Sequence, residues 1–201
     1  MRRTTIDAVM APIIEAAPFL TGVTITGGEP TAQPEFLHAL LTTLAEHPVT
    51  SRLTRFVDSN GDASLETWDR LAPVLDGVML DLKAISNERH IVLTGQSNHR
   101  TLAALVRLLA LGKLIEVRLL LVPGVNDDPA MLARTARWLV SLDPQIRVRV
   151  NAYRRHGTRA CARSLLEVRP GDRDRYRDEG SERAGVSEGG DLPKRKQASQ
   201  H

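Results

Sequence analysis

The sequence of 201 residues contains a single cysteine, Cys161. One thiol can form neither an internal disulfide nor a metal site built from several cysteines. Aromatic residues make up only 3% of the chain, so we expect a core of Leu, Val, Ile and Ala. No run reaches the ~18 consecutive apolar residues of a membrane span, and no apolar signal core follows the start MRRTTIDAVM. We therefore expect a cytoplasmic protein that does not bind a membrane.

The charge is also nearly balanced over most of the chain. Of the net +3, residues 159–201 contribute ten Lys/Arg and eight Asp/Glu, which leaves 17 positive and 16 negative charges in residues 1–158. A body this close to neutral gives little support to nucleic-acid binding. Residues 159–201 have no apolar period, so we expect one domain over 1–158 and a disordered tail beyond it. A natural tail and a frame change near Arg159 both remain open as origins of this arginine-rich end.

Helix-like and strand-like segments alternate along the body. Apolar residues recur at helical spacing in five segments: 6–16, 34–46, 64–73, 100–111 and 129–141. Between them lie five strand-like segments: 22–26, 53–61, 77–83, 114–124 and 145–153. Pro12 suits the first helix only if it falls near the first turns. The alternation predicts an α/β fold with five parallel strands, either a barrel or an open sheet.

Polar and glycine residues collect where each predicted strand ends. The carboxyl ends of parallel strands share one side of the sheet, and ligands bind there. In chain order these ends carry Gly27, Gly28 and Glu29; Asp58, Ser59 and Asn60; Asp81 and Lys83; Pro123 to Asn126; and Asn151, Tyr153 and His156.

Charged residues also lie inside two of the strands. Strand alternation puts Asp81 and Lys83 on one face and leucines on the other, and Glu116 and Arg118 repeat this pattern on the next strand. Buried charges are costly unless they are paired or bind a ligand. Arg118 with Lys83 suits a carboxylate, and Asp58 with Asp81 suits an ammonium group or a cation. One ligand that carries both groups is an amino acid.

Structural interpretations of the same residues remain open. A Gly-Gly-Glu-Pro segment is more often a turn than a site, and Asp-Ser-Asn-Gly ends strands for conformational reasons alone. Each charge pair also fits a purely structural role. An unrelated barrel enzyme that handles an amino acid or a phosphate is a further alternative, although the sequence has no G-x-x-x-x-G-K loop.

Five segments together resemble the activating enzymes of glycyl radical enzymes, of the pyruvate formate-lyase activase type. The segments are GVTITGGEPTAQPEFL, VDSNG, VMLDLK, GQSNHRTL and EVRLLLVPGVNDD, and the ordered similarity runs from about residue 6 to residue 158. The resemblance implies a partial (β/α) barrel of the radical S-adenosylmethionine (SAM) type, open at the edge of its first strand. The segment NAYRRHGTR is most similar to the YjjW branch of these activases.

The resemblance also implies the roles of individual residues. The amino group of the SAM methionine would be received by Gly27, Gly28 and Glu29. Its carboxylate would be held by Lys83, Arg118 and a histidine after the last strand, for which His156 is the nearest candidate. A monovalent cation site beside SAM matches Asp58, Ser59, Met79 and Asp81, with Ser59 where the family usually has Thr. The family's Pro-Tyr-His reads Ala152-Tyr153-Arg154 here.

One motif of the family, the cysteine motif that binds its cluster, has no counterpart in this sequence. The activases bind a [4Fe-4S] cluster through Cys-x-x-x-Cys-x-x-Cys on the loop after their first strand, and no cysteine precedes residue 22 here. We therefore expect the first strand and its loop to be missing from this chain, which leaves the iron–sulfur ligands absent and no catalytic residue assigned.

In the family, reduced flavodoxin or ferredoxin supplies the electron that cleaves SAM. The activase then takes a hydrogen atom from a glycine of a partner glycyl radical enzyme, which makes it an oxidoreductase. Without cluster ligands we expect this chain alone to be inactive and to bind SAM weakly or not at all. A non-catalytic remnant is the alternative to a fragment of an active activase.

Overall fold

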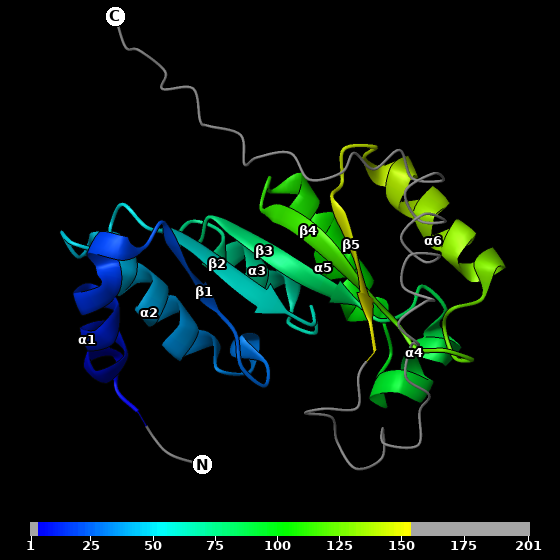
Figure 1. Cartoon of the computed structure of the whole chain (residues 1–201), viewed down its shortest axis with the longest axis horizontal. Coiled ribbons are helices and arrows are strands. Elements are labelled where there is room, and N and C mark those ends of the chain that lie inside the picture. Colours follow the sequence, from blue (N-terminus) through cyan, green and yellow to red (C-terminus); the bar gives the residue numbers. More distant parts are fainter. Residues whose placement is uncertain (1–3, 154–201) are drawn as a thin grey trace, which may run out of the picture.

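A computed structural model of the chain describes residues 4–153, in which five parallel strands form one sheet (Figure 1). The strands lie side by side in chain order, so each βαβ unit adds one strand next to the previous one. They are β1 (Gly22–Ile25), β2 (Thr54–Ser59), β3 (Gly77–Leu82), β4 (Leu114–Leu121) and β5 (Val148–Ala152). Among the described residues β1 and β5 each pair with one neighbour only, so the sheet is an open partial barrel.

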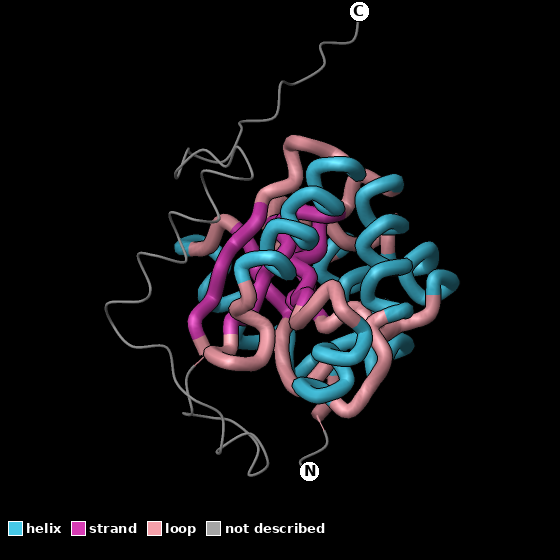
Figure 2. The backbone as a smooth tube through the Cα atoms, turned by 90° about the vertical axis from the view of Figure 1, so that its right-hand side faces the viewer, coloured by secondary structure: helices cyan, strands magenta, loops and turns pink. Residues whose placement is uncertain are grey.

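Helices cover one face of this sheet, and Figure 2 shows most of them on one side of the strands. The α-helices are α1 (Ile6–Ala16), α2 (Pro34–Glu46), α3 (Leu65–Leu71), α4 (Asn87–Thr94), α5 (His99–Ala110) and α6 (Pro129–Leu142). Two short 3-10 turns, η1 (Ala17–Phe19) and η2 (Pro30–Ala32), flank β1. The face that the helices leave open is the inner face of the partial barrel.

The core between helices and sheet follows from strand alternation. On β3 the buried Val78, Leu80 and Leu82 face the helices, where Trp68 of α3 and Leu105 of α5 pack against them. Burying one such side chain stabilises the fold by roughly 1.5–3 kcal/mol. The alternate residues of each strand consequently face the opposite, inner side.

The α/β fold with five parallel strands and the partial-barrel architecture are confirmed. Helix α4 was not predicted, because its sequence NERHIVLT lacks a regular apolar stripe. Ser86 caps its start through the Arg89 N–H, and Gly95 ends it with a φ of 76°.

Pro12 lies at the seventh residue of α1, although the sequence suggested that it fits only near the first turns. Its side chain is exposed, so water can reach the backbone carbonyl that loses its helical partner.

The other expectations fall partly outside the described residues. The predicted tail at 159–201 and the boundary near residue 158 lie beyond residue 153, and so do His156 and Cys161. Within residues 4–153, no helix combines the length and the hydropathy needed to cross a membrane.

Candidate functional site

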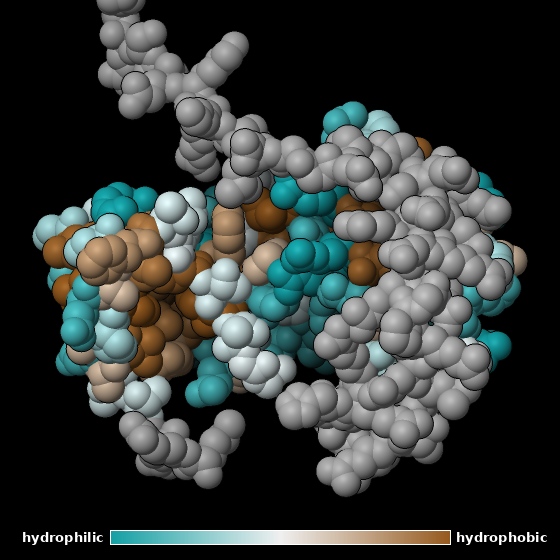
Figure 3. Space-filling view, viewed as in Figure 1, coloured by the Kyte–Doolittle hydropathy of each residue, from teal (hydrophilic) through white to brown (hydrophobic). Residues whose placement is uncertain are grey.

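Charged side chains from three neighbouring strands meet on the inner face of the sheet. Strand register places Asp58 of β2 beside Met79 of β3, and Asp81 of β3 beside Arg118 of β4. Viewed from this side, hydrophilic residues gather over the middle of the sheet, where β3 and β4 lie (Figure 3). The register, with the ion pair between Arg118 and Asp58, brings Asp58, Asp81 and Arg118 together on this face.

Arg118 is the centre of the largest charge network on this face. Its Nη1 donates to Asp58 Oδ2 at 2.7 Å, its Nε to Glu116 Oε1 at 2.8 Å, and its Nη2 to the Met79 sulfur at 2.8 Å. Burial disfavours the charged form, but the bonds and charges of Glu116 and Asp58 together outweigh it and raise the pKa of Arg118 above its ordinary value. The guanidinium therefore stays charged and points into the inner face.

Lys83 and Asp81 form a second, separate pair. The Lys83 Nζ lies 2.6 Å from Asp81 Oδ2, and both side chains keep about a quarter of their surface exposed. An ion pair with this much solvent contact contributes at most about 1 kcal/mol to stability. Its two charges are therefore open to exchange partners with a ligand.

Glu29 connects the loop after β1 to the end of β2. Its Oε1 accepts from the Thr31 N–H, the Thr31 hydroxyl and the Ser59 hydroxyl, and its Oε2 accepts from the Asn60 N–H at 2.8 Å. The Ser59 hydroxyl in turn accepts from the Gly61 N–H. Both hydroxyl and carboxylate are thus committed to holding the two loops together.

Gly27 and Gly28 lie next to this clamp and leave space above the sheet. Both residues are exposed, and a Cβ added to either would meet no atom of the described residues within 4 Å. Neither has a positive φ, so the backbone conformation does not require glycine there. The pair instead leaves backbone open to close approach by a ligand.

Most of the predicted site residues that the structure describes lie at the open side of the sheet, and Ser59 does not. Gly27, Gly28 and Glu29 follow β1, while the charged residues of β2, β3 and β4 lie on the inner face. Ser59 differs from its neighbour Asp58, because it is buried on the opposite face of β2.

One candidate on this face was missed by the reasoning from sequence. Arg149 is the register partner of Arg118, and its side chain is 61% exposed with Glu116 at 4.0 Å. Asn126, which the sequence placed at the end of the fourth strand, is buried in the turn after β4. The sequence signal for Arg149 was the alternation of β5, which places it on the same face as Asn151.

The fold is a partial α/β barrel with helices outside and paired charges on its open inner face. Proteins of this class bind ligands at the carboxyl ends of their strands. The sequence profile of the Radical SAM superfamily matches residues 2–136. The chain belongs to the radical SAM superfamily.

Relatives within that superfamily include activating enzymes. The Pyruvate formate-lyase-activating enzyme of Staphylococcus aureus (strain USA300) is 31% identical over 162 residues, which cover 78% of this chain. The chain spans 64% of the length of that relative. The similarity shows homology to pyruvate formate-lyase-activating enzymes, as the sequence motifs predicted.

Solved structures share the fold. A domain of a pyruvate-formate lyase-activating enzyme from Bacteroides vulgatus has a TM-score of 0.66 at 24% identity, and it covers 82% of this chain and 95% of that one. Streptococcus suis SuiB bound to S-adenosylmethionine has a TM-score of 0.69 at 17% identity, covering 89% of this chain and 40% of that one. At these identities the likeness establishes the fold alone.

Proposed function

We propose that the inner face of this sheet binds the methionine part of SAM and that the chain derives from an activase of a glycyl radical enzyme. The observation that carries the proposal is a group of two cations and two carboxylates on this face. Asp81 is the register partner of Arg118, and the ion pairs Arg118–Asp58 and Lys83–Asp81 join the other two residues to them. An amino acid presents one ammonium and one carboxylate, and opposite charges on a partly desolvated surface bind both.

Each predicted residue has a proposed part in this arrangement. Lys83 and Arg118 would hold the carboxylate, with His156 as a further candidate, and the loop of Gly27 and Gly28 would receive the ammonium group. Glu29 would act through its clamp on the loop, because its carboxylate already accepts four hydrogen bonds.

A monovalent cation beside SAM would use the carboxylates of Asp58 and Asp81. Since the Ser59 hydroxyl is buried on the other face, Ser59 would contribute its backbone oxygen. A cation there would replace the Arg118 guanidinium as the partner of Asp58, which frees Arg118 for the ligand's carboxylate.

The chain's residues do not fit the [4Fe-4S] cluster of the superfamily. Residues 4–153 contain no cysteine, and no three His, Cys, Asp or Glu side chains among them are placed to hold a metal ion. Cys161 is one thiolate, whereas Fe–S clusters are held by several. We therefore assign to this chain the SAM-binding face and no step of radical formation.

A non-catalytic remnant of such an activase is the second candidate, and the single cysteine of these 201 residues is compatible with both candidates. Electron transfer from flavodoxin or ferredoxin and hydrogen abstraction from a glycyl radical enzyme would then belong to relatives with cluster ligands. Both candidates share the inner face as the SAM-binding surface, so the same experiment tests that face.

Substitution of Lys83 tests the proposal. SAM titrated into the wild-type protein should bind with a Kd of about 1 mM, which corresponds to a binding free energy of about −4 kcal/mol. Lys83→Ala should remove a charged hydrogen bond of roughly 1.5–3 kcal/mol and abolish saturation in the millimolar range. Its melting temperature should change little, because the pair with Asp81 is partly exposed.

Arg70→Gln is the matched control. It also removes one cation from an ion pair, with Glu35 at 2.7 Å, but this pair is more exposed than Lys83–Asp81, and Arg70 lies on α3 outside the inner face. If Lys83→Ala lowers the melting temperature and leaves SAM binding unchanged, Lys83 is structural and the proposed site is wrong.

A further inference from the structure

Three successive backbone carbonyls after β3 are each bonded by a buried side-chain amide. Asn126 donates from Nδ2 to the carbonyl of Lys83 at 2.6 Å. Asn98 donates from Nδ2 to the carbonyls of Ala84, at 3.1 Å, and Ile85, at 2.9 Å. The two asparagines are 3% and 1% exposed, so water does not compete for these bonds.

The two amides come from elements that are distant in sequence. Asn98 precedes α5 and belongs to the segment GQSNHRTL, and Asn126 lies in the turn after β4 within VPGVNDD. Neither segment contributes a charged side chain to the proposed contacts with SAM. Both asparagines instead bond the backbone of residues 83–85, the segment that begins with Lys83.

Asn126 forms three hydrogen bonds between the ends of β3 and β4, two as donor and one as acceptor. Besides Lys83 it donates to the Leu120 carbonyl at 2.6 Å, and its Oδ1 accepts from the Val122 N–H at 2.6 Å. Its amide therefore ties the end of β3 to the end of β4, the strand that carries Arg118.

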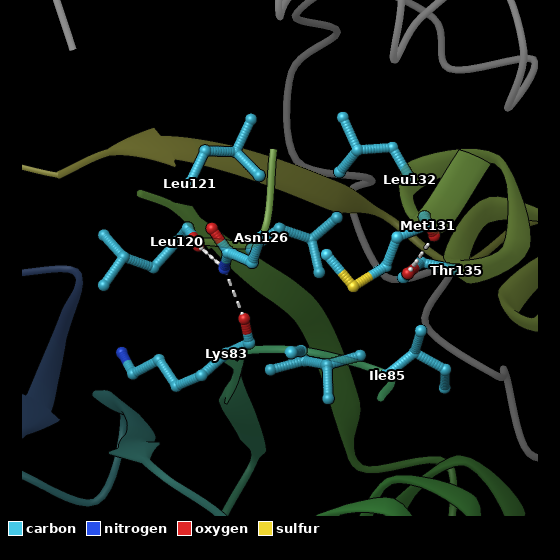
Figure 4. A pocket seen from close by; sticks show the side chains of 11 residues that line it. Lys83, Ile85, Leu120, Leu121, Asn126, Met131, Leu132 and Thr135 are labelled. Atoms are coloured by element: carbon cyan, nitrogen blue, oxygen red, sulfur yellow. Dashed lines mark hydrogen bonds between the residues drawn. The ribbon is translucent and has the colours of Figure 1, made fainter. Parts of the chain in front are cut away.

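The close-up in Figure 4 shows the consequence for Lys83. The Lys83 carbonyl points to the Asn126 amide, while its side chain runs the other way, away from Ile85, Met131 and Leu132. A lysine side chain has four rotatable bonds and loses much entropy when it is held in place. A fixed backbone lowers that cost, because only the side chain remains to be ordered.

We infer that Asn98 and Asn126 are positioning residues, which hold the backbone of residues 83–85 so that the Lys83 ammonium is presented on the inner face. This inference rests on the proposed function, in which the Lys83 ammonium binds the carboxylate of SAM. The hold on Lys83 itself can be measured without any ligand, so the two ideas can fail separately.

The experiment measures how fast Lys83 is acylated by an amine-reactive reagent in the folded full chain, read by mass spectrometry. Lys113, whose Nζ donates to the Leu75 carbonyl, is the internal reference. Asn126→Asp keeps the shape and the acceptor for Val122 but removes both donors. The Lys83 rate relative to Lys113 should rise about tenfold, since buried hydrogen bonds of ordinary strength no longer oppose opening of the segment.

Asn98→Asp is the second variant, and it decides the matter if Asn126→Asp does not fold. It removes the donors to residues 84 and 85, while an aspartate before α5 favours the helix start and offsets part of the lost stability. Thr50→Val is the control, because it removes a different buried hydrogen bond, to the Leu44 carbonyl, far from β3.

A rise in the Lys83 rate with either aspartate variant and none with Thr50→Val supports the inference. Equal rates in the aspartate variants and Thr50→Val would overturn it and leave the asparagines as ordinary structural residues. Addition of SAM to the wild type is a separate arm: protection of Lys83 supports the proposed function, and its absence counts against that function without changing the comparison of variants.

Discussion

Gly28 has open space around it, whereas Gly61 lies in a crowded turn. Alanine substitutions at the two positions therefore distinguish an effect on ligand binding from an effect on stability. Gly28→Ala should leave the free energy of unfolding unchanged within about 0.5 kcal/mol, because the new Cβ meets nothing. Gly61→Ala should cost about 1 kcal/mol or more, since φ is +76° and a Cβ would lie 3.1 Å from Leu80 Cδ1.

Urea unfolding of both variants measures this difference, and SAM titration completes the test. Gly28→Ala should weaken SAM binding despite its normal stability. Equal loss of stability in both variants would show that Gly28 serves the turn and not a ligand.

His90 of α4 gives the protein a predictable pH dependence. It is 5% exposed, its Nδ1 has no hydrogen-bond partner within residues 4–153, and burial lowers its pKa below the ordinary value of 6.5. A hydrogen bond with the Ala84 backbone opposes this shift, and the charge of Lys83 adds to it. The folded protein therefore takes up the proton less readily than the unfolded chain.

The sign of the effect on stability follows from that difference. The contribution of neutral His90 is fully present above pH 6.5 and is lost as the pH falls through the lower folded-state pKa. Unfolding measured at a series of pH values should show stability falling in this window, and His90→Gln should flatten that part of the curve. An unchanged decline in His90→Gln would assign the effect to other groups.

Residue types and spacing predicted which charged side chains share the inner face but not their hydrogen bonds. Period-2 alternation was enough to place Asp81 with Lys83, and Glu116 with Arg118, on the inner face. The clamp made by Glu29 depends on loop backbone positions, which no local pattern specifies. Nothing in the spacing shows that Glu29 would reach Ser59, thirty residues away.

At the scale of elements, β1 and β2 are joined at their carboxyl ends by that clamp. Glu29→Gln keeps the size but turns an amide NH₂ toward a backbone N–H that needs an acceptor, at Asn60 or Thr31. The free energy of unfolding should fall by roughly 1.5–3 kcal/mol, the range for hydrogen bonds to charged groups.

Glu35→Gln is the matched control for denaturant unfolding of this variant. It removes a carboxylate from the exposed pair with Arg70 and should cost less than about 1 kcal/mol. Losses of equal size in the two variants would contradict the clamp.

The positions of the strands and the long helices could be predicted from apolar periodicity, because each of these elements buries one continuous apolar face. Helix α5, with Ala104, Leu105 and Leu108 buried, is an example. Helix α4 escaped prediction because His90 is the only residue of it that is buried. Its bounds are set by Ser86 and Gly95, and such capping signals are common in loops as well.

For the whole molecule, the cysteine content limits the chemistry. Anaerobic reconstitution of the purified chain with iron and sulfide should yield no stoichiometric [4Fe-4S] cluster per monomer, because Cys161 offers one thiolate. Iron and sulfide analysis with the visible absorption spectrum checks this. A full cluster on the monomer would show that other side chains replace the missing thiolates.

The central claim is that the inner face of the sheet holds the methionine part of SAM. Its most direct test is an NMR titration of the isotope-labelled chain with SAM, followed through assigned backbone amides. The account predicts saturable shifts at residues 27–29, 58–60, 81–83 and 118, with none on the helices of the opposite face. Shifts confined to other surfaces, or no shifts at several times about 1 mM SAM, would contradict it.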